Sequence, residues 1–223
     1  MSKISAATFQ FLTELKTHND REWFTANKPR YEAAHKEFLQ FIDTLISEIG
    51  AFDPGIRHYT AKDCVFRIYR DVRFSKDKSP YKTHFGAHIT PAAKKSEIHT
   101  RAGYYLHLEP GATMLAGGAY MPESKWLKAI RQEIAYNTTE FLGILNNADF
   151  KKYFGKMEGE KLKTTPNDYP ADHPAIELLK HKSFLAAHYC TDEQALSDGF
   201  LKHCAGVFRA LRPFDSFLNR STD

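Results

Sequence analysis

The sequence is poor in cysteine and contains no long apolar run. Its three cysteines, Cys64, Cys190 and Cys204, are odd in number and widely spaced, and none forms a C-x-x-C pair. This pattern argues against a disulfide framework and against a thiolate zinc site. No stretch of about 18 apolar residues is present, and the first residues lack the apolar core of a signal peptide. We therefore expect a protein of the reducing cytoplasm with no membrane partner.

The sequence also lacks the short motifs that identify common cofactors. It has no Walker A motif, no G-x-G-x-x-G and no G-x-S-x-G, and its aromatic-rich segment does not match RNP1. The cofactor is therefore left open, and so is the question of whether the chain catalyses a reaction.

An excess of charge of one sign is nearly absent as well. Lys and Arg number 31 and Asp and Glu number 27, which gives a formal net charge of +4. Residues 62–82 hold seven of these cations and three of the anions, so the two signs balance in the rest of the chain. A diffuse affinity for polyanions is not favoured, because the whole excess lies in one short segment.

Apolar residues are sufficient for a core, and their spacing predicts the elements. They make up 42% of the chain. Helical spacing is seen in the first 50 residues and again after Pro122, up to a last helix expected to end near Pro213. Period-two alternation predicts strands over 64–74, 84–89, 103–109 and 114–120. We expect a single α+β domain over residues 1–223, with an antiparallel β-meander of about four or more strands packed on one face by N- and C-terminal helices.

Strand alternation then predicts a polar face on this sheet. Gly86, Gly103, Ala116 and Gly118 would lower its floor, and His84 would lie across from His107, with about 5 Å between the Cβ atoms. Such a concave polar surface is typical of a ligand site. The alternative is a face that is simply solvated. The polar side chains of this face are expected to be Arg67, Tyr69, Asp71, Arg73, His84, His88, Tyr105 and His107.

The leading hypothesis is that this face binds a small anionic, phosphorylated ligand. Arg67 and Arg73 would lie roughly 20 Å apart along a strand, so they cannot hold one phosphate, whereas the cations from Arg73 to Lys82 are compact. For acid–base chemistry the candidates are His84 and His107, which titrate near neutral pH, and then Asp71. The predicted ligand-binding residues are Arg67, Arg73, Lys76, Lys78, Tyr81, Lys82, His88 and Tyr105.

Three other hypotheses remain open. His84, His88 and His107 could converge beside Glu109 or Asp71, but no close ligand spacing fixes a geometry, so no metal site is predicted. A nucleic acid could bind by stacking on aromatic side chains among the cations. The chain could also be a non-catalytic interaction module whose basic turn docks an acidic partner, although no protein partner is identified. The aromatic candidates for stacking are Tyr69, Phe74 and Tyr81.

Four segments of the chain carry a resemblance to a known family. They are NDREWFTANK (19–28) with Tyr31, RIYRDVRFSKDKSPYK (67–82) with Thr83, GYYLHLEPG (103–111), and Asp172-His173-Pro174 with LKHKSF (179–184). Together they resemble the conserved hypothetical proteins catalogued as domain of unknown function 2461, although Asp20 stands where that family usually has a second asparagine. The resemblance implies a single intracellular α+β domain of a kind found in bacteria and fungi. Because no reaction is assigned to that family, it implies no catalytic residue.

Overall fold

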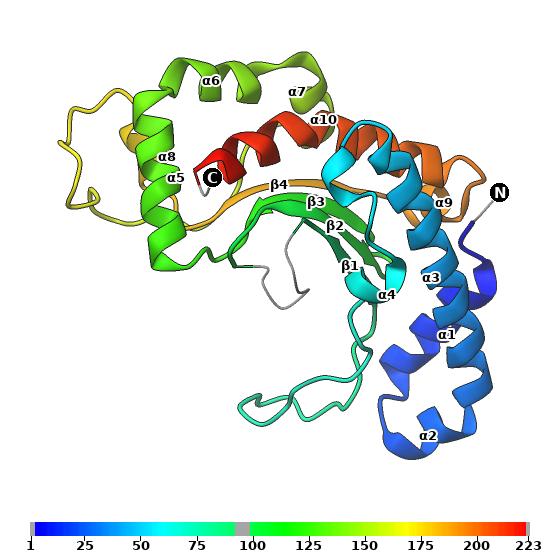
Figure 1. The fold of residues 1–223 in the computed structure, drawn as a ribbon. Helices are drawn as coiled ribbons and strands as arrows, with labels where there is room; N and C mark the ends of the chain where they lie inside the picture. Colours follow the sequence, from blue (N-terminus) through cyan, green and yellow to red (C-terminus); the bar gives the residue numbers. More distant parts are fainter. Residues whose placement is uncertain (1–2, 92–98, 222–223) are drawn as a thin grey trace. The chain divides into compact units, whose positions relative to one another are not determined.

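A four-stranded antiparallel sheet accompanied by helices forms the fold (Figure 1). The structure is a computed structural model that describes residues 3–91 and 99–221. The sheet has the order β1-β2-β3-β4, so its first three strands form a meander, and the predicted α+β class is confirmed. The strands are β1 (Phe85–Ile89), β2 (Gly103–Leu108), β3 (Met114–Ala119) and β4 (Phe184–Tyr189).

The chain divides into two compact units, each of which draws on several segments. The first contains residues 3–89, 105–115 and 189–206, and the second contains the described residues between 90 and 104 together with 116–188 and 207–221.

The helices of the first unit begin where the sequence supplies caps and pack through apolar stripes. Ser5 accepts a hydrogen bond from the Thr8 amide at the start of α1 (Ala6–Thr17), and Asp20 does the same for Trp23 at α2 (Arg21–Ala26). The long α3 (Lys28–Gly50) has Pro29 in its first turn, as predicted. Its Phe38 packs on Phe85 of β1, with 5.3 Å between ring centroids. Short helices complete the unit: η1 (Pro54–Ile56), α4 (Ala61–Cys64), α9 (Asp192–Leu196) and the first turns of α10 (Phe200–Arg220).

The predicted strand over residues 64–74 is wrong. Residues 66–84, which we call the arm, run as a long excursion without regular strand or helix (Figure 1). Its two limbs pair only through isolated contacts such as the Tyr69–Tyr81 bridge. Asp71 and Asp77 accept hydrogen bonds from the backbone amides of Arg73 and Ser79, which are then not available for a β-ladder. Pro80 has no amide hydrogen to donate to such a ladder. The arm's side chains therefore do not share a face of the sheet.

The second unit is built on α5 (Ser124–Tyr136), whose predicted stripe of Trp126, Ile130 and Ile134 is buried. Aromatic rings join its other helices, because Phe141 packs on Phe217 with 4.7 Å between centroids and Phe150 packs on Phe214 with 5.5 Å. The shorter helices are α6 (Thr138–Asn146), α7 (Ala148–Phe154) and α8 (Ile176–Leu179).

Two further predictions fail within the second unit. α10 does not end near Pro213 but continues to Arg220, because Phe214, Phe217 and Leu218 extend its buried stripe. Gly118 does not lower the floor of an open polar face. A Cβ atom there would meet the Phe184 carbonyl of β4 and the Phe214 ring, so this position is filled.

The three cysteines are buried, and none forms a disulfide within the part of the chain that the structure describes. Burial raises the pKa of Cys190 to about 11 and that of Cys204 well above its ordinary value. Both thiols are therefore protonated near neutral pH. Among the helices of the described residues, none combines the length and the apolar composition that a membrane span requires.

Candidate functional site

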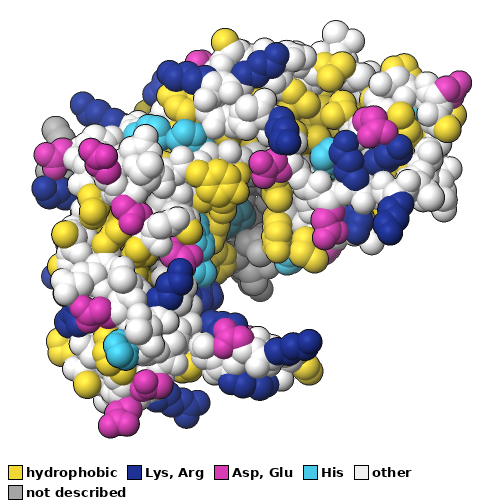
Figure 2. All heavy atoms as spheres, turned by 180° about the vertical axis from the view of Figure 1, so that it is seen from behind, with side chains coloured by type: hydrophobic (Ala, Val, Ile, Leu, Met, Phe, Trp, Pro, Cys, Tyr) yellow, Lys and Arg dark blue, Asp and Glu magenta, His cyan; other side chains and the backbone are white. Residues whose placement is uncertain are grey.

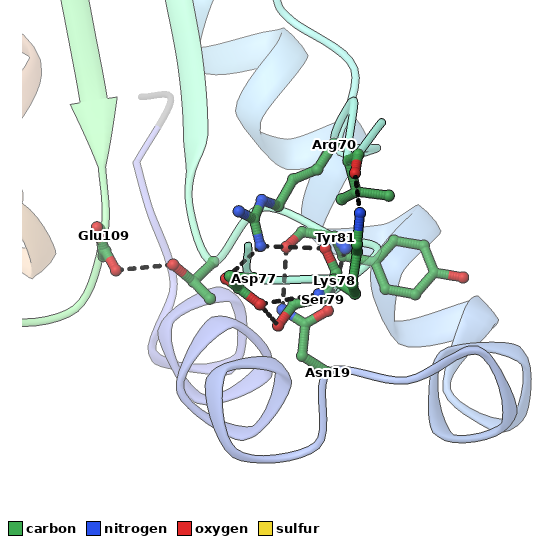
Figure 3. Close-up of polar contacts among 9 residues, drawn as sticks. Asn19, Arg70, Asp77, Lys78, Ser79, Tyr81 and Glu109 are labelled. Atoms are coloured by element: carbon green, nitrogen blue, oxygen red, sulfur yellow. Dashed lines mark hydrogen bonds and ion pairs between the residues drawn. The ribbon is translucent and has the colours of Figure 1, made fainter. Parts of the chain in front are cut away.

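The base of the arm is clamped by one asparagine. Asn19, between α1 and α2, donates to the Tyr81 carbonyl and accepts from the Tyr81 amide, both at 3.0 Å (Figure 3). The Asn19 side chain thus satisfies both backbone groups of Tyr81, as a neighbouring strand would, although the two residues are 62 positions apart in the sequence. The Tyr81 ring stacks on Phe24, with 3.9 Å between centroids, and is buried. Tyr81, a predicted ligand contact, therefore anchors the arm through its ring and backbone.

Arg70 and Asp77 tie the two limbs of the arm together above this clamp. Arg70 Nη1 donates to Asp77 Oδ2 at 2.5 Å and to the Ser79 carbonyl at 3.1 Å (Figure 3). The hydroxyl and the amide of Ser79 donate to Asp77 Oδ1. These bonds, with a smaller contribution from Arg70, lower the pKa of Asp77 to about 2.

Three side chains meet where the arm leads into β1. The His84 and His107 rings lie 4.0 Å apart between centroids, which confirms that the two histidines face one another. His107 Nε2 lies 2.9 Å from Glu109 Oε2. Because β2 alternates, His107 and the following Glu109 point to the same side. His84, His107 and Glu109 each place one potential ligand atom within 4.8 Å of those of the other two, and we call these residues the triad.

Further contacts hold the triad in place from behind. The Tyr105 hydroxyl lies 3.1 Å from His107 Nδ1, and it also covers Gly86, where a Cβ atom would lie 3.1 Å from that oxygen. Gly86 is therefore buried beneath Tyr105 and does not form the open, low floor that the sequence predicted. On the other side of the triad, Thr83 donates to Glu109 Oε1 at 2.9 Å, and Lys16 Nζ lies 3.5 Å from the same oxygen.

Burial sets the protonation of the triad. Loss of solvent, and then the neighbouring His107, lower the pKa of His84 to about 4, so His84 is neutral near pH 7. Burial acts to raise the pKa of Glu109, but hydrogen bonds from His107 and Thr83 outweigh it, and the net pKa lies below its ordinary value. The triad thus combines a neutral imidazole with a carboxylate.

A pocket of about 300 Å³ opens beside the triad within the first unit. Its cations are Lys16, Arg70 and Lys82, against one carboxylate, Asp77. Lys82 is half-buried, with its ammonium 5.2 Å from the Phe66 ring centroid. Burial, and then the charge of Arg67, lower the pKa of Lys82. The residues that line the pocket are Lys16, Asn19, Arg70, Asp77, Ser79, Tyr81, Lys82, Thr83 and His84.

The other predicted site residues lie apart from this pocket. Asp71 binds Arg73 in a bidentate pair at 2.7 Å, and the Arg73 side chain is 77% exposed. That pairing lowers the pKa of Asp71 to about 2. Lys78 donates to the Val72 carbonyl at 2.9 Å. Figure 2 shows dark blue side chains on the projecting arm with magenta among them, so carboxylates accompany the cations of the arm. Exposed positions are those of Arg67, Asp71, Arg73, Lys76 and Lys78, whereas His88 is buried in β1.

Comparison with known proteins gives one match. The model of a family described as conserved hypothetical protein (DUF2461) matches residues 7–217. The chain belongs to this family. No curated protein and no solved structure matches it significantly.

In this DUF2461 protein, six of the nine residues that line the pocket were not among the predicted site residues: Lys16, Asn19, Arg70, Asp77, Ser79 and Thr83. Lys16 and Asn19 precede the first residue of the arm by 50 and 47 positions, and no periodicity in the sequence links them to it. In the predicted strand, the alternation of side chains would have pointed Arg70 away from the polar face. The arm is not a strand, so this alternation does not apply to Arg70. The segment Asn19 to Lys28, which carries part of the family resemblance, was the one signal in the sequence that pointed to Asn19.

Proposed function

We propose that the pocket at the base of the arm binds a small anionic ligand, with a phosphoryl group as its anion. The observation that carries this proposal is the environment of Lys82. Its ammonium is half-buried over Phe66, and within the described part of the chain no carboxylate forms an ion pair with it. A partly desolvated charge without a counterion is costly, so a bound anion would stabilise it.

The neighbouring cations support the same ligand. Arg70 and Lys16 each line the pocket while already bound to a carboxylate, Asp77 and Glu109 respectively. They hold their positions without a ligand and leave donors for an incoming oxyanion, since a guanidinium has five N–H groups and an ammonium three. This arrangement moves the proposed ligand from the middle of the arm, around Arg73 and Lys76, to its base.

His84 is the histidine that lines the pocket, so we assign it the contact with the ligand. His107 lies behind it, oriented by Tyr105 and Glu109. If the ligand is a substrate, His84 and His107 are the groups that would exchange a proton with it.

The test compares two lysines of the same segment by titration calorimetry with inorganic phosphate and sugar phosphates. Lys82→Gln should weaken binding by about 10-fold or more, which corresponds to roughly 1.4 kcal/mol. Lys76→Gln removes the same charge from an exposed position and should change the affinity by less than about twofold. Absence of binding by the unaltered chain, or equal losses in both variants, would contradict the proposal.

A further inference from the structure

The triad has the composition and the compactness of a transition-metal site. We propose that His84, His107 and Glu109 bind a divalent first-row transition ion such as Zn²⁺ at the inner wall of the pocket. Two imidazoles and one carboxylate are a ligand set that zinc enzymes use when they keep a fourth position open. The same ligand set also binds non-haem iron. The proposal therefore covers the divalent ions that accept nitrogen and oxygen ligands without a thiolate.

The distances suit this ion. Zinc bonds of about 2.0–2.1 Å in a tetrahedron place the ligand atoms roughly 3.3 Å apart. His107 Nε2 and Glu109 Oε2 are already 2.9 Å apart, and the three ligand atoms, one from each residue, lie no more than 4.8 Å from one another. Binding therefore requires an approach by His84 of at most about 1.5 Å. His84 is the residue able to make it, because it ends the arm and precedes β1, whereas His107 lies within β2.

The contacts behind the triad are those that orient metal ligands. A ligating histidine normally engages its second nitrogen with a hydrogen-bonding group, and His107 Nδ1 has the Tyr105 hydroxyl at 3.1 Å. Glu109 divides its oxygens in the same way, since Oε1 receives Thr83 and Lys16 while Oε2 faces His107. His107 and Glu109 are therefore oriented by their neighbours before any ion arrives.

The fourth position would open on the pocket, because Thr83 and His84 belong both to its lining and to the surroundings of the triad. An anion in the pocket could then complete the coordination, and a bound cation would strengthen anion binding. The metal proposal does not depend on the proposed anion, because metal binding is measured without one.

The decisive measurement is calorimetric titration of Zn²⁺ into chelator-treated protein in a buffer free of phosphate. The unaltered chain should bind one equivalent that is lost, or weakened by at least about 100-fold, in His84→Ala and in Glu109→Gln. Tyr105→Phe removes only the orienting hydroxyl and should weaken binding by about 10-fold. His58→Ala removes a histidine outside the triad and should retain this equivalent.

Two further readouts separate the possible failures. Lys82→Gln should lose phosphate affinity and keep its Zn²⁺ equivalent, so the anion and metal proposals can fail independently. Co²⁺ bound at the triad should give visible d–d bands that Glu109→Gln abolishes, and this nearly isosteric variant decides the matter if His84→Ala does not fold. Failure of the unaltered chain to bind Zn²⁺, or equal affinity in Glu109→Gln, would overturn the inference.

Discussion

At the scale of single residues, Gly118 is the position where a methyl group should do most harm. Its φ of +107° lies where side chains are strained, and a Cβ atom would lie 2.0 Å from the Phe184 carbonyl oxygen. Gly118→Ala should therefore lower the free energy of unfolding by about 3 kcal/mol or more, as measured by urea denaturation.

Gly143 provides the matched control for this substitution. It lies exposed within α6, and a Cβ atom added there has no neighbour within 4 Å among the described residues. Gly143→Ala should raise the free energy of unfolding by about 0.5–1 kcal/mol, because alanine loses less backbone entropy in a helix. A loss of stability at Gly143, or none at Gly118, would show that the backbone near these glycines differs from the structure.

The pairing of His84 with His107 was predictable at this scale, whereas the role of Lys16 was not. Alternation along two adjacent strands fixes which side chains face each other once the connecting loop is recognised. By contrast, Lys16 reaches Glu109 from the end of α1 across 93 positions of sequence, a tertiary contact that no local pattern encodes.

At the scale of elements, the arm depends on the clamp made by Asn19. Asn19→Ala removes both hydrogen bonds to the Tyr81 backbone and leaves those groups unpaired beside a buried ring. We expect a loss of about 1–3 kcal/mol in the free energy of unfolding. Hydrogen exchange of the Tyr81 amide should accelerate by about 10-fold or more, since its acceptor is gone.

Two variants frame this prediction. Asn146→Ala alters an exposed asparagine at the end of α6 and should change stability by less than about 0.5 kcal/mol. Asn19→Asp keeps the acceptor for the Tyr81 amide and loses the donor to its carbonyl, so its effect should fall between those of Asn19→Ala and the unaltered chain. If Asn19→Ala matched the Asn146 control, the clamp would not hold the arm.

The elements predicted correctly are those whose apolar period is confirmed by burial. The stripe from Phe38 to Ile49 and the alternation from Tyr104 to Leu108 both meet a core. The arm has the same alternation over 66–74, yet Phe74 is 96% exposed. Period two indicates a strand only where a neighbour supplies the ladder, and local aspartate–amide bonds replaced it here. β4 (Phe184–Tyr189) was missed because strand and helix cannot be told apart from the apolar pattern of so short a segment, which has two alanines at its centre.

At the scale of the whole molecule, the net charge of +4 should attract polyanions less strongly than the number of cations in residues 62–82 suggests. Arg70 and Arg73 are already paired with Asp77 and Asp71. We therefore predict that single-stranded or double-stranded nucleic acid binds no more tightly than about 10 µM near 150 mM salt, with a log–log salt slope shallower than about 3. Fluorescence anisotropy over a range of salt concentrations measures both quantities.

A double variant of the arm makes this charge prediction specific. Lys76→Gln with Lys78→Gln removes two exposed cations and should leave the weak nucleic-acid affinity nearly unchanged at physiological salt. Submicromolar binding that falls steeply in this variant would instead support a nucleic-acid function for the family member described here.

Because His84 directly precedes β1 and His107 lies in β2, an intact triad also reports that these two strands are paired correctly. His107 and Glu109 face His84 only while β1 and β2 keep their native alignment, because side chains alternate along the strand. A slip of one residue would present Leu106 and Leu108 instead, and would turn the polar side chains into the core. An error in the alignment of β1 with β2 would therefore disrupt both the triad and the core, so a chain that carries the intact triad has also paired these two strands correctly.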